Sequence, residues 1–215
     1  MRTRLKVCCI SSPAEARLAI RYGAEALGLV GDMPSGPGII TDTLAAEIVA
    51  QVPPPISTFL LTQETTAEGI IAHHRRVPAT TLQLVDAPTE PDVYARVRAA
   101  RPGVKIVQVL HVLGEETLAE AMTVAKEVDA LLLDSGNPNL AVKELGGTGR
   151  THDWAISRQI VAQSPVPVFL AGGLRPDNVR AAVEAVRPFG VDLCSGIRTD
   201  GQLDEEKLRA FVAQL

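Results

Sequence analysis

Short apolar runs alternate with longer amphipathic runs along the whole chain. The apolar runs predict strands buried on both faces, as in a parallel sheet, and they cover residues 5–10, 26–30, 56–62, 80–85, 105–112, 130–135, 167–173 and 190–196. The amphipathic runs have helical spacing and cover residues 13–23, 41–52, 65–77, 90–101, 114–128, 153–163, 176–187 and 204–214. The pattern therefore predicts an α/β protein of repeated strand–helix units.

Eight such units are the number that closes into a single (β/α)8 TIM barrel, and 215 residues is near the lower end for that fold. An open, doubly wound parallel sheet is the alternative architecture. No linker, low-complexity segment or second repeat family interrupts the series, so we expect one domain over residues 1–215.

Composition and charge exclude several classes of binding partner. The net charge is -4 with both signs interspersed, which gives no basic surface for nucleic acid and no polybasic membrane anchor. No apolar run approaches the ~20 residues of a membrane span. The three cysteines are few and odd in number, so we expect no disulfide framework and a reducing cytoplasm. No zinc motif and no dinucleotide fingerprint is present.

Glycines gather at the ends of the predicted strands, where a barrel of this kind places its active site. "LAGGLRPDNV" brings Gly172 and Gly173, and "LCSGIRTDG" brings Ser195 and Gly196. The loops after strands 7 and 8 are a frequent phosphate site in this fold, and glycine lets the backbone approach a ligand closely. The further candidates from neighbouring loops are Gly147, Gly149, Arg150 and Asp177. We interpret these loops as a phosphate site, the alternative being tight turns.

Cys8 and Asp134 end the first and sixth predicted strands, which face one another across a barrel mouth. A thiolate and a carboxylic acid facing one substrate can act as general base and general acid. The alternative is a small buried thiol and a loop carboxylate. His111 ends the fifth strand and is a further candidate for the mouth.

Four stretches together resemble the phosphoribosylanthranilate isomerase family. "KVCCIS" is similar to its first strand, K-V-C-G-I-T, and "LLLDS…GGTGRTHDW" to its sixth strand and following loop. "FLAGGLRPDNV" and "GVDLCSGI" are similar to its two phosphate loops, and the order agrees over the whole chain. The resemblance implies an Amadori rearrangement of N-(5'-phosphoribosyl)anthranilate in tryptophan biosynthesis, with Cys8 as base and Asp134 as acid. It implies no metal or cofactor, and a monomer or a homodimer.

The chain departs from the family pattern where the anthranilate binds. Cys9 replaces the glycine after the catalytic cysteine, and Gly38 stands near the position of the arginine that pairs with the anthranilate carboxylate. Val85 and Asp86 replace a His-Gly pair, and Arg198 replaces an acid and is a candidate for the missing cation. Two alternatives therefore stay open: a paralogue acting as isomerase or lyase on another phosphorylated sugar, and a catalytically silent barrel that binds one.

Overall fold

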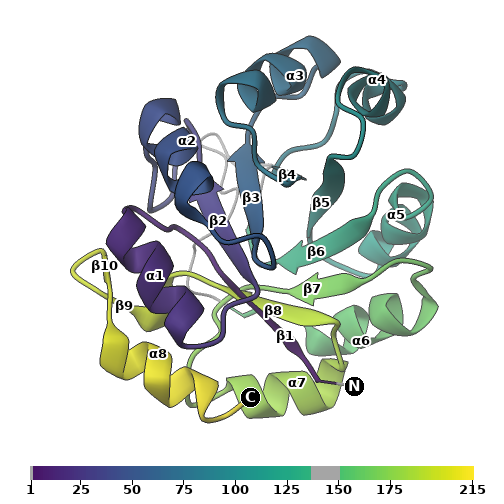
Figure 1. Ribbon diagram of the computed structural model, residues 1–215. Coiled ribbons are helices and arrows are strands. Elements are labelled where there is room, and N and C mark those ends of the chain that lie inside the picture. The colour runs from purple at the N-terminus through teal and green to yellow at the C-terminus, as the bar shows by residue number, and fades with distance from the viewer. Residues whose placement is uncertain (1, 137–150) are drawn as a thin grey trace.

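The computed structural model describes residues 2–136 and 151–215, and in these residues eight parallel strands close into a barrel in sequence order. Each strand lies beside the next, and the last returns to pair with the first, with Arg4 opposite Gly190 and Val7 opposite Leu193. The helices surround this ring of strands (Figure 1). The predicted TIM barrel is confirmed, and the open-sheet alternative is wrong.

The strands and helices alternate as the hydrophobic pattern predicts, with shorter bounds. The strands are β1 (Arg4–Val7), β2 (Ala26–Val30), β3 (Ser57–Thr62), β4 (Thr81–Leu84), β5 (Lys105–His111), β6 (Ala130–Asp134), β7 (Val168–Leu170) and β8 (Gly190–Leu193). The helices are α1 (Pro13–Arg21), α2 (Asp42–Gln51), α3 (Ala67–Arg76), α4 (Val93–Ala100), α5 (Glu116–Val124), α6 (Trp154–Gln163), α7 (Val179–Val186) and α8 (Glu205–Val212).

Local sequence signals explain where several helices begin. The side-chain oxygens of Ser12, Thr41, Thr66, Asp153 and Asp204 each accept a hydrogen bond from a backbone N–H in the first turn of the helix that follows. Such caps satisfy donors that have no partner inside the helix. They fix the ends of the strand–helix loops, and these loops carry the candidate site.

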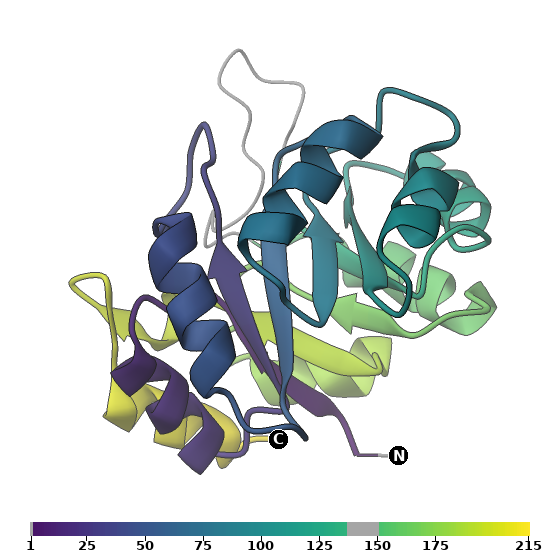
Figure 2. The same cartoon turned by 45° about the horizontal axis from the view of Figure 1, so that its top comes forward.

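After β8 the chain forms an element that the pattern does not predict. A short 3-10 helix, η1 (Ser195–Ile197), leads into a hairpin of β9 (Arg198–Thr199) and β10 (Gln202–Leu203). Asp200 and Gly201 both have positive φ at its turn, as a two-residue hairpin requires. The hairpin projects beside α8 and α1 (Figure 2).

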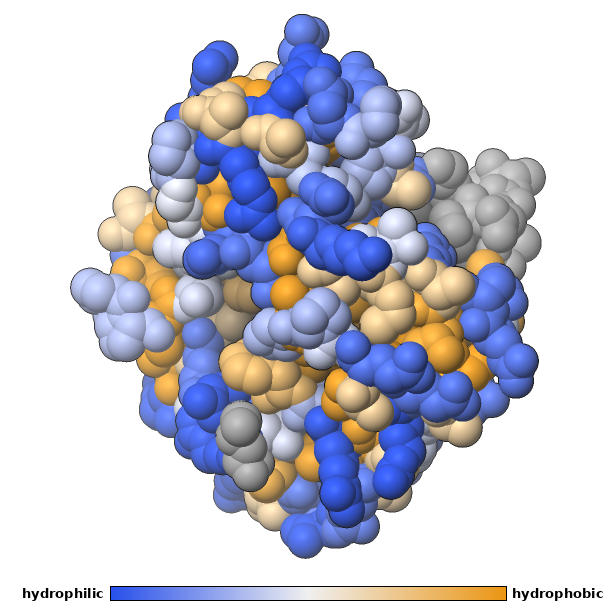
Figure 3. Space-filling view, turned by 90° about the vertical axis from the view of Figure 1, so that its right-hand side faces the viewer, coloured by the Kyte–Doolittle hydropathy of each residue, from blue (hydrophilic) through white to orange (hydrophobic). Residues whose placement is uncertain are grey.

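Two groups of apolar side chains fill the molecule. The larger lies between the strands and the surrounding helices, and the smaller fills the barrel interior below the mouth with Val107, Leu132 and Phe169 among its members. The outer surface over α5 and its neighbours is mainly hydrophilic, with small apolar areas between charged side chains (Figure 3). No helix in the described part of the chain is long and apolar enough to cross a membrane.

Candidate active site at the barrel mouth

A pocket opens at the carboxyl ends of the strands. Its described lining comes from the ends of β1, β2, β3, β4, β6, β7 and β8, and it includes Cys8, Asp134, Gly172, Gly173 and Ser195. The structure therefore brings the expected base, the expected acid and most of the expected phosphate loops to one pocket. Gly147, Gly149 and Arg150 lie outside the described residues.

Asp134 ends β6 inside the mouth and is 8% exposed. Burial raises the pKa of Asp134, and the backbone N–H of Ser135, which donates to Oδ1 at 2.7 Å, opposes that rise only in part. His111 on β5 is the strand neighbour of Asp134 and also favours its ionised form. A buried carboxyl with a raised pKa can hold a proton for delivery to a substrate.

Cys8 lies just beyond β1 and is 5% exposed, although it lines the pocket. Burial raises the pKa of the Cys8 thiol to about 11, and the nearby Lys6 ammonium opposes that rise. The thiolate is the form that can accept a proton, so the charges around Cys8 decide how well it serves as a base.

The glycines after β7 and β8 have the properties expected of a close approach. Gly172 and Gly173 have φ of 83° and 62°, in the left-handed region that favours glycine. A Cβ on Gly196 would collide with the carbonyl of Leu174, so the β7 and β8 loops touch at this glycine. The two loops therefore form a continuous backbone wall on one side of the pocket.

The structure places His111 and Asp86 away from this pocket. Both line a second cavity, between the ends of β4 and β5 and the helices α4 and α5. The imidazole nitrogens of His111 are buried and have no hydrogen-bond partner among the described residues. The expectation that His111 contacts a ligand in the mouth is therefore not supported, and Asp86 does not add its charge to the mouth lining.

Asp177 is also outside the mouth. Its carboxylate accepts a hydrogen bond from Arg175 at 3.2 Å, and its side chain is 70% exposed. It lies on the surface before α7, so the structure gives it no part in the pocket.

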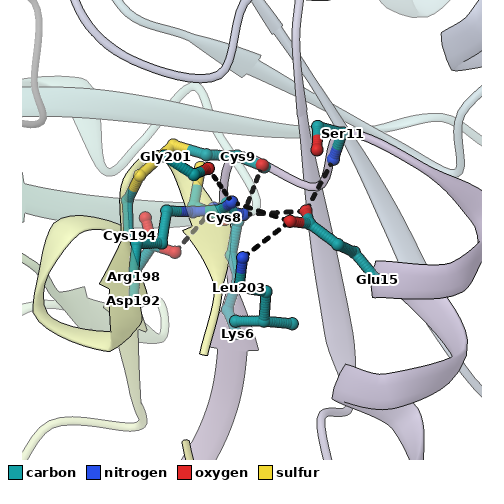
Figure 4. The surroundings of a disulfide bond; sticks show 10 residues. All are labelled: Lys6, Cys8, Cys9, Ser11, Glu15, Asp192, Cys194, Arg198, Gly201 and Leu203. Carbon is teal, nitrogen blue, oxygen red and sulfur yellow. Dashed lines mark hydrogen bonds and ion pairs between the residues drawn. A yellow bond between two sulfur atoms is a disulfide. The ribbon is translucent and has the colours of Figure 1, made fainter. Parts of the chain in front are cut away.

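Arg198 does not supply the cation missing from the mouth. Its guanidinium pairs with Glu15 of α1 at 3.0 Å and donates to the carbonyl oxygens of Cys8, Cys9 and Gly201 (Figure 4). It is only 9% exposed. We therefore remove Arg198 from the candidate substrate contacts: its charge is already neutralised by Glu15, and it fixes the end of β1.

A disulfide joins Cys9 to Cys194, with their Cα atoms 5.8 Å apart (Figure 4). The expectation of no disulfide is therefore wrong. The two cysteines are 185 residues apart in sequence, but the closed barrel places the ends of β1 and β8 side by side. Cys8 remains the free cysteine.

Cys9 and Gly38 depart from the family pattern together. Cys9 has a φ of 62°, and a Cβ on Gly38 would collide with the Cβ of Cys9. Gly38 itself has a φ of 79°, so any larger residue there would be both strained and obstructed. Cys9 thus leaves no room for an arginine at position 38, and the described mouth lining contains no Arg or Lys.

Two charged residues of the site, Lys6 and Asp192, were not predicted from the sequence. Lys6 lies inside the barrel directly below Cys8, and its Nζ donates to Asp192 Oδ1 of β8 at 2.8 Å. The sequence signal that could have identified them was a single charged residue within each of two predicted apolar strands, 5–10 and 190–196. In the described residues no group of three or more His, Cys, Asp or Glu side chains could hold a metal ion.

Comparison with known proteins agrees with this geometry. The family model described as N-(5'phosphoribosyl)anthranilate (PRA) isomerase matches residues 5–214. Proteins named N-(5'-phosphoribosyl)anthranilate isomerase include one from Methanocella arvoryzae, 34% identical over 99% of this chain and 98% of its own. Another, from Haloferax volcanii, is 38% identical over 98% of this chain and 92% of its own.

Solved structures agree as well. The phosphoribosyl anthranilate isomerase from Thermotoga maritima superposes with a TM-score of 0.82 at 27% identity, covering 99% of this chain and 98% of that chain. The enzyme from Thermus thermophilus gives 0.81 at 26% identity with the same coverage.

Proposed function

The chain belongs to the N-(5'-phosphoribosyl)anthranilate isomerase family, and from that premise we propose that it isomerises this substrate in tryptophan biosynthesis with Cys8 as general base and Asp134 as general acid. The observation that carries the assignment of roles is the convergence of both side chains on one pocket beside the β7 and β8 loops. A solved family structure is described as a complex with reduced 1-(o-carboxyphenylamino)-1-deoxyribulose 5-phosphate, a ligand with both a phosphate and a carboxylate.

The reaction begins at the ring oxygen of the ribose. Asp134 gives its proton to that oxygen, the bond from the oxygen to C1 breaks, and the nitrogen lone pair forms a C1=N double bond. The raised pKa of Asp134 supports this role, because burial keeps the proton on the carboxyl until the substrate oxygen takes it.

The second step is the removal of the proton on C2. The Cys8 thiolate takes it, and the C–H electron pair forms the C1=C2 bond of an enolamine while the iminium nitrogen becomes neutral. Tautomerisation then gives the C2 ketone. Metal and cofactor are not needed for either step, because the iminium is itself the electron sink.

The substrate phosphate would lie against the backbone of Gly172, Gly173, Ser195 and Gly196. Neutral N–H groups of such loops bind phosphate without a full positive charge. Gly147, Gly149 and Arg150 remain proposed contacts of the same ligand, and Arg150 is the cation we propose for its anionic groups. The anthranilate would lie toward Ser35 and Pro37 in the loop after β2, which also line the pocket.

The test is turnover of phosphoribosylanthranilate, followed by loss of its fluorescence, in wild type, Cys8→Ala and Asp134→Asn. We expect kcat to fall by about 10²- to 10⁴-fold in each variant, the usual effect of losing a general base or acid. Glu206→Gln is the matched control, because Glu206 is an exposed residue paired with Arg209 on α8 and should leave kcat unchanged. Circular dichroism and the melting temperature confirm that each variant is folded.

Absence of turnover by the wild type would contradict the proposal. Thermal stabilisation by a panel of sugar phosphates then separates a paralogue, which also turns one of them over, from a silent barrel, which only binds.

We keep a cytoplasmic location, a single domain and a monomer or homodimer as parts of the proposal. Tryptophan biosynthesis from a phosphorylated metabolite supports the first, and the closure of one barrel by strands from both halves of the chain supports the second. A Thermotoga maritima relative is described as dimeric, and sedimentation velocity decides the third for this protein.

A further inference from the structure

Lys6 is a fully buried lysine in the wall of the barrel, 0% exposed. Its ammonium contacts the carboxylate of Asp192 at 2.8 Å and lies 5.2 Å from the centre of the Phe59 ring. Burying an ion pair costs several kcal/mol of desolvation per charge, and apolar residues of similar size are often as stabilising. Stability alone therefore does not explain a buried ion pair next to the candidate base Cys8.

The Lys6 ammonium lies next to the Cys8 thiol. Cys8 follows β1 two positions after Lys6, and its backbone N–H still donates to Leu193 of β8, so the alternation of the strand places both side chains on the same face of the barrel. The Lys6 ammonium donates to Asp192 at 2.8 Å and also interacts electrostatically with the Cys8 side chain. On the adjacent strand, a Cβ on Gly28 would come within 3.0 Å of Lys6 Nζ and 2.6 Å of Cys8 Sγ, so the two groups meet in the space that this glycine leaves.

We propose that Lys6 is a positioning residue for Cys8: its ammonium, held in place by Asp192, stabilises the thiolate that removes the proton from C2. The role of this thiolate in turnover rests on the proposed function, whereas its stabilisation by Lys6 does not. The proposal gives the buried pair a purpose that the two catalytic steps above leave unassigned.

The other charges around Cys8 are consistent with this assignment. Burial lowers the pKa of Lys6, but Asp192 and Cys8 outweigh burial and raise it, so the side chain stays protonated. Asp192 also acts on Cys8 directly, and there its negative charge raises the pKa of the thiol. Asp134 lies across the pocket, and Arg198 reaches only the backbone oxygen of Cys8, so Lys6 is the cation at the sulfur among the described residues.

Two variants isolate the ammonium. Lys6→Met alone would leave Asp192 as an unpaired buried charge, so we compare Asp192→Asn with the double variant Lys6→Met/Asp192→Asn. The two proteins differ only in the presence of the lysine, and both carry a neutral residue at position 192. Melting temperatures and circular dichroism establish that both are folded.

The primary measurement is the rate at which iodoacetamide alkylates Cys8 without reductant as a function of pH, with the site identified by mass spectrometry. We expect the double variant to react at least about tenfold more slowly near pH 8 than Asp192→Asn, because a neighbouring cation lowers a thiol pKa by about one unit or more. Its rate profile should be displaced to higher pH accordingly. Equal rates and coincident profiles would overturn the inference, since a merely structural lysine would not move thiolate formation.

Turnover of phosphoribosylanthranilate by the same two proteins separates this inference from the proposed function. A parallel tenfold fall in kcat/KM supports both. Slower alkylation in an enzyme whose wild type shows no turnover supports the inference about the thiolate and contradicts the proposed function. Normal turnover with unchanged alkylation in the double variant overturns the inference and leaves the proposed function intact.

Discussion

Gly28 shows how a single missing side chain shapes the reactive end of the barrel. It lies on β2, where its hydrogen atom faces both Cys8 and Lys6. We expect Gly28→Ala to displace Cys8, lowering kcat/KM at least about tenfold and the free energy of unfolding by about 1–3 kcal/mol, the usual cost of overpacking. Gly69→Ala is the control: Gly69 is half-buried on α3, far from Cys8 in the fold, and its new Cβ would mainly meet the flexible end of Glu64. Chemical denaturation and the turnover assay measure both effects, and equal behaviour of the two variants would contradict this account.

At the same scale, sequence patterns can predict that some residues lie in the site, and for others they cannot. Cys8 and Asp134 end apolar strands, and strand ends meet at one face of a barrel, so their convergence follows from the fold. Arg198 also follows a strand end, but its direction depends on Glu15, a residue 183 positions away. Sequence spacing contains no information about such a partner, and the guanidinium points to α1 instead of the mouth.

At the scale of elements, the disulfide connects the two strands that close the barrel. It joins the end of β1 to the end of β8, next to Ser195 of the proposed phosphate loop. We expect a reductant to lower the free energy of unfolding by about 2–4 kcal/mol, because the cross-link restricts the unfolded chain. For a protein of this size that corresponds to a fall in melting temperature of roughly 5–15 °C.

The control for this prediction is the double variant Cys9→Ser/Cys194→Ser, whose melting temperature should not respond to the reductant. Calorimetry of both proteins with and without reductant gives the four values. Identical melting temperatures for the oxidised and reduced wild type would contradict the prediction.

Helices and strands that bury a continuous apolar face could be predicted from the sequence. Elements whose bounds depend on turn conformation or on pairing between short strands were predicted less well. All eight barrel strands and their helices lie within or close to the predicted ranges. The strand predicted over 167–173 ends at Leu170, because Gly172 and Gly173 adopt positive φ. The β9–β10 hairpin was missed although Asp200–Gly201 is a recognised hairpin signal, because its strands are two residues long and lack an alternating pattern.

At the scale of the whole molecule, buried histidines on opposite sides of the barrel predict a loss of stability in acid. Burial lowers the pKa of His73, of His74 and of His152, the last from 6.5 to about 4. Below pH 6.5 the unfolded chain takes up protons at these positions that the folded protein does not. Stability is therefore complete above pH 6.5 and falls as the pH approaches 4, by about 3 kcal/mol through His152 alone.

Denaturant unfolding of wild type and His152→Gln at intervals from pH 7 to pH 4 tests this linkage. Glutamine cannot titrate, but it can keep a hydrogen bond to Ser157, which His152 contacts at 2.7 Å. We expect the variant to lose about 3 kcal/mol less than the wild type over this range, with His73 and His74 supplying the remaining slope. Parallel curves for the two proteins would show that His152 takes up its proton equally in both states, contrary to the burial that surrounds it. Because a Cβ on Gly172 would come within 3.1 Å of His152 Nδ1, a protonated His152 would place its positive charge next to the proposed phosphate loop.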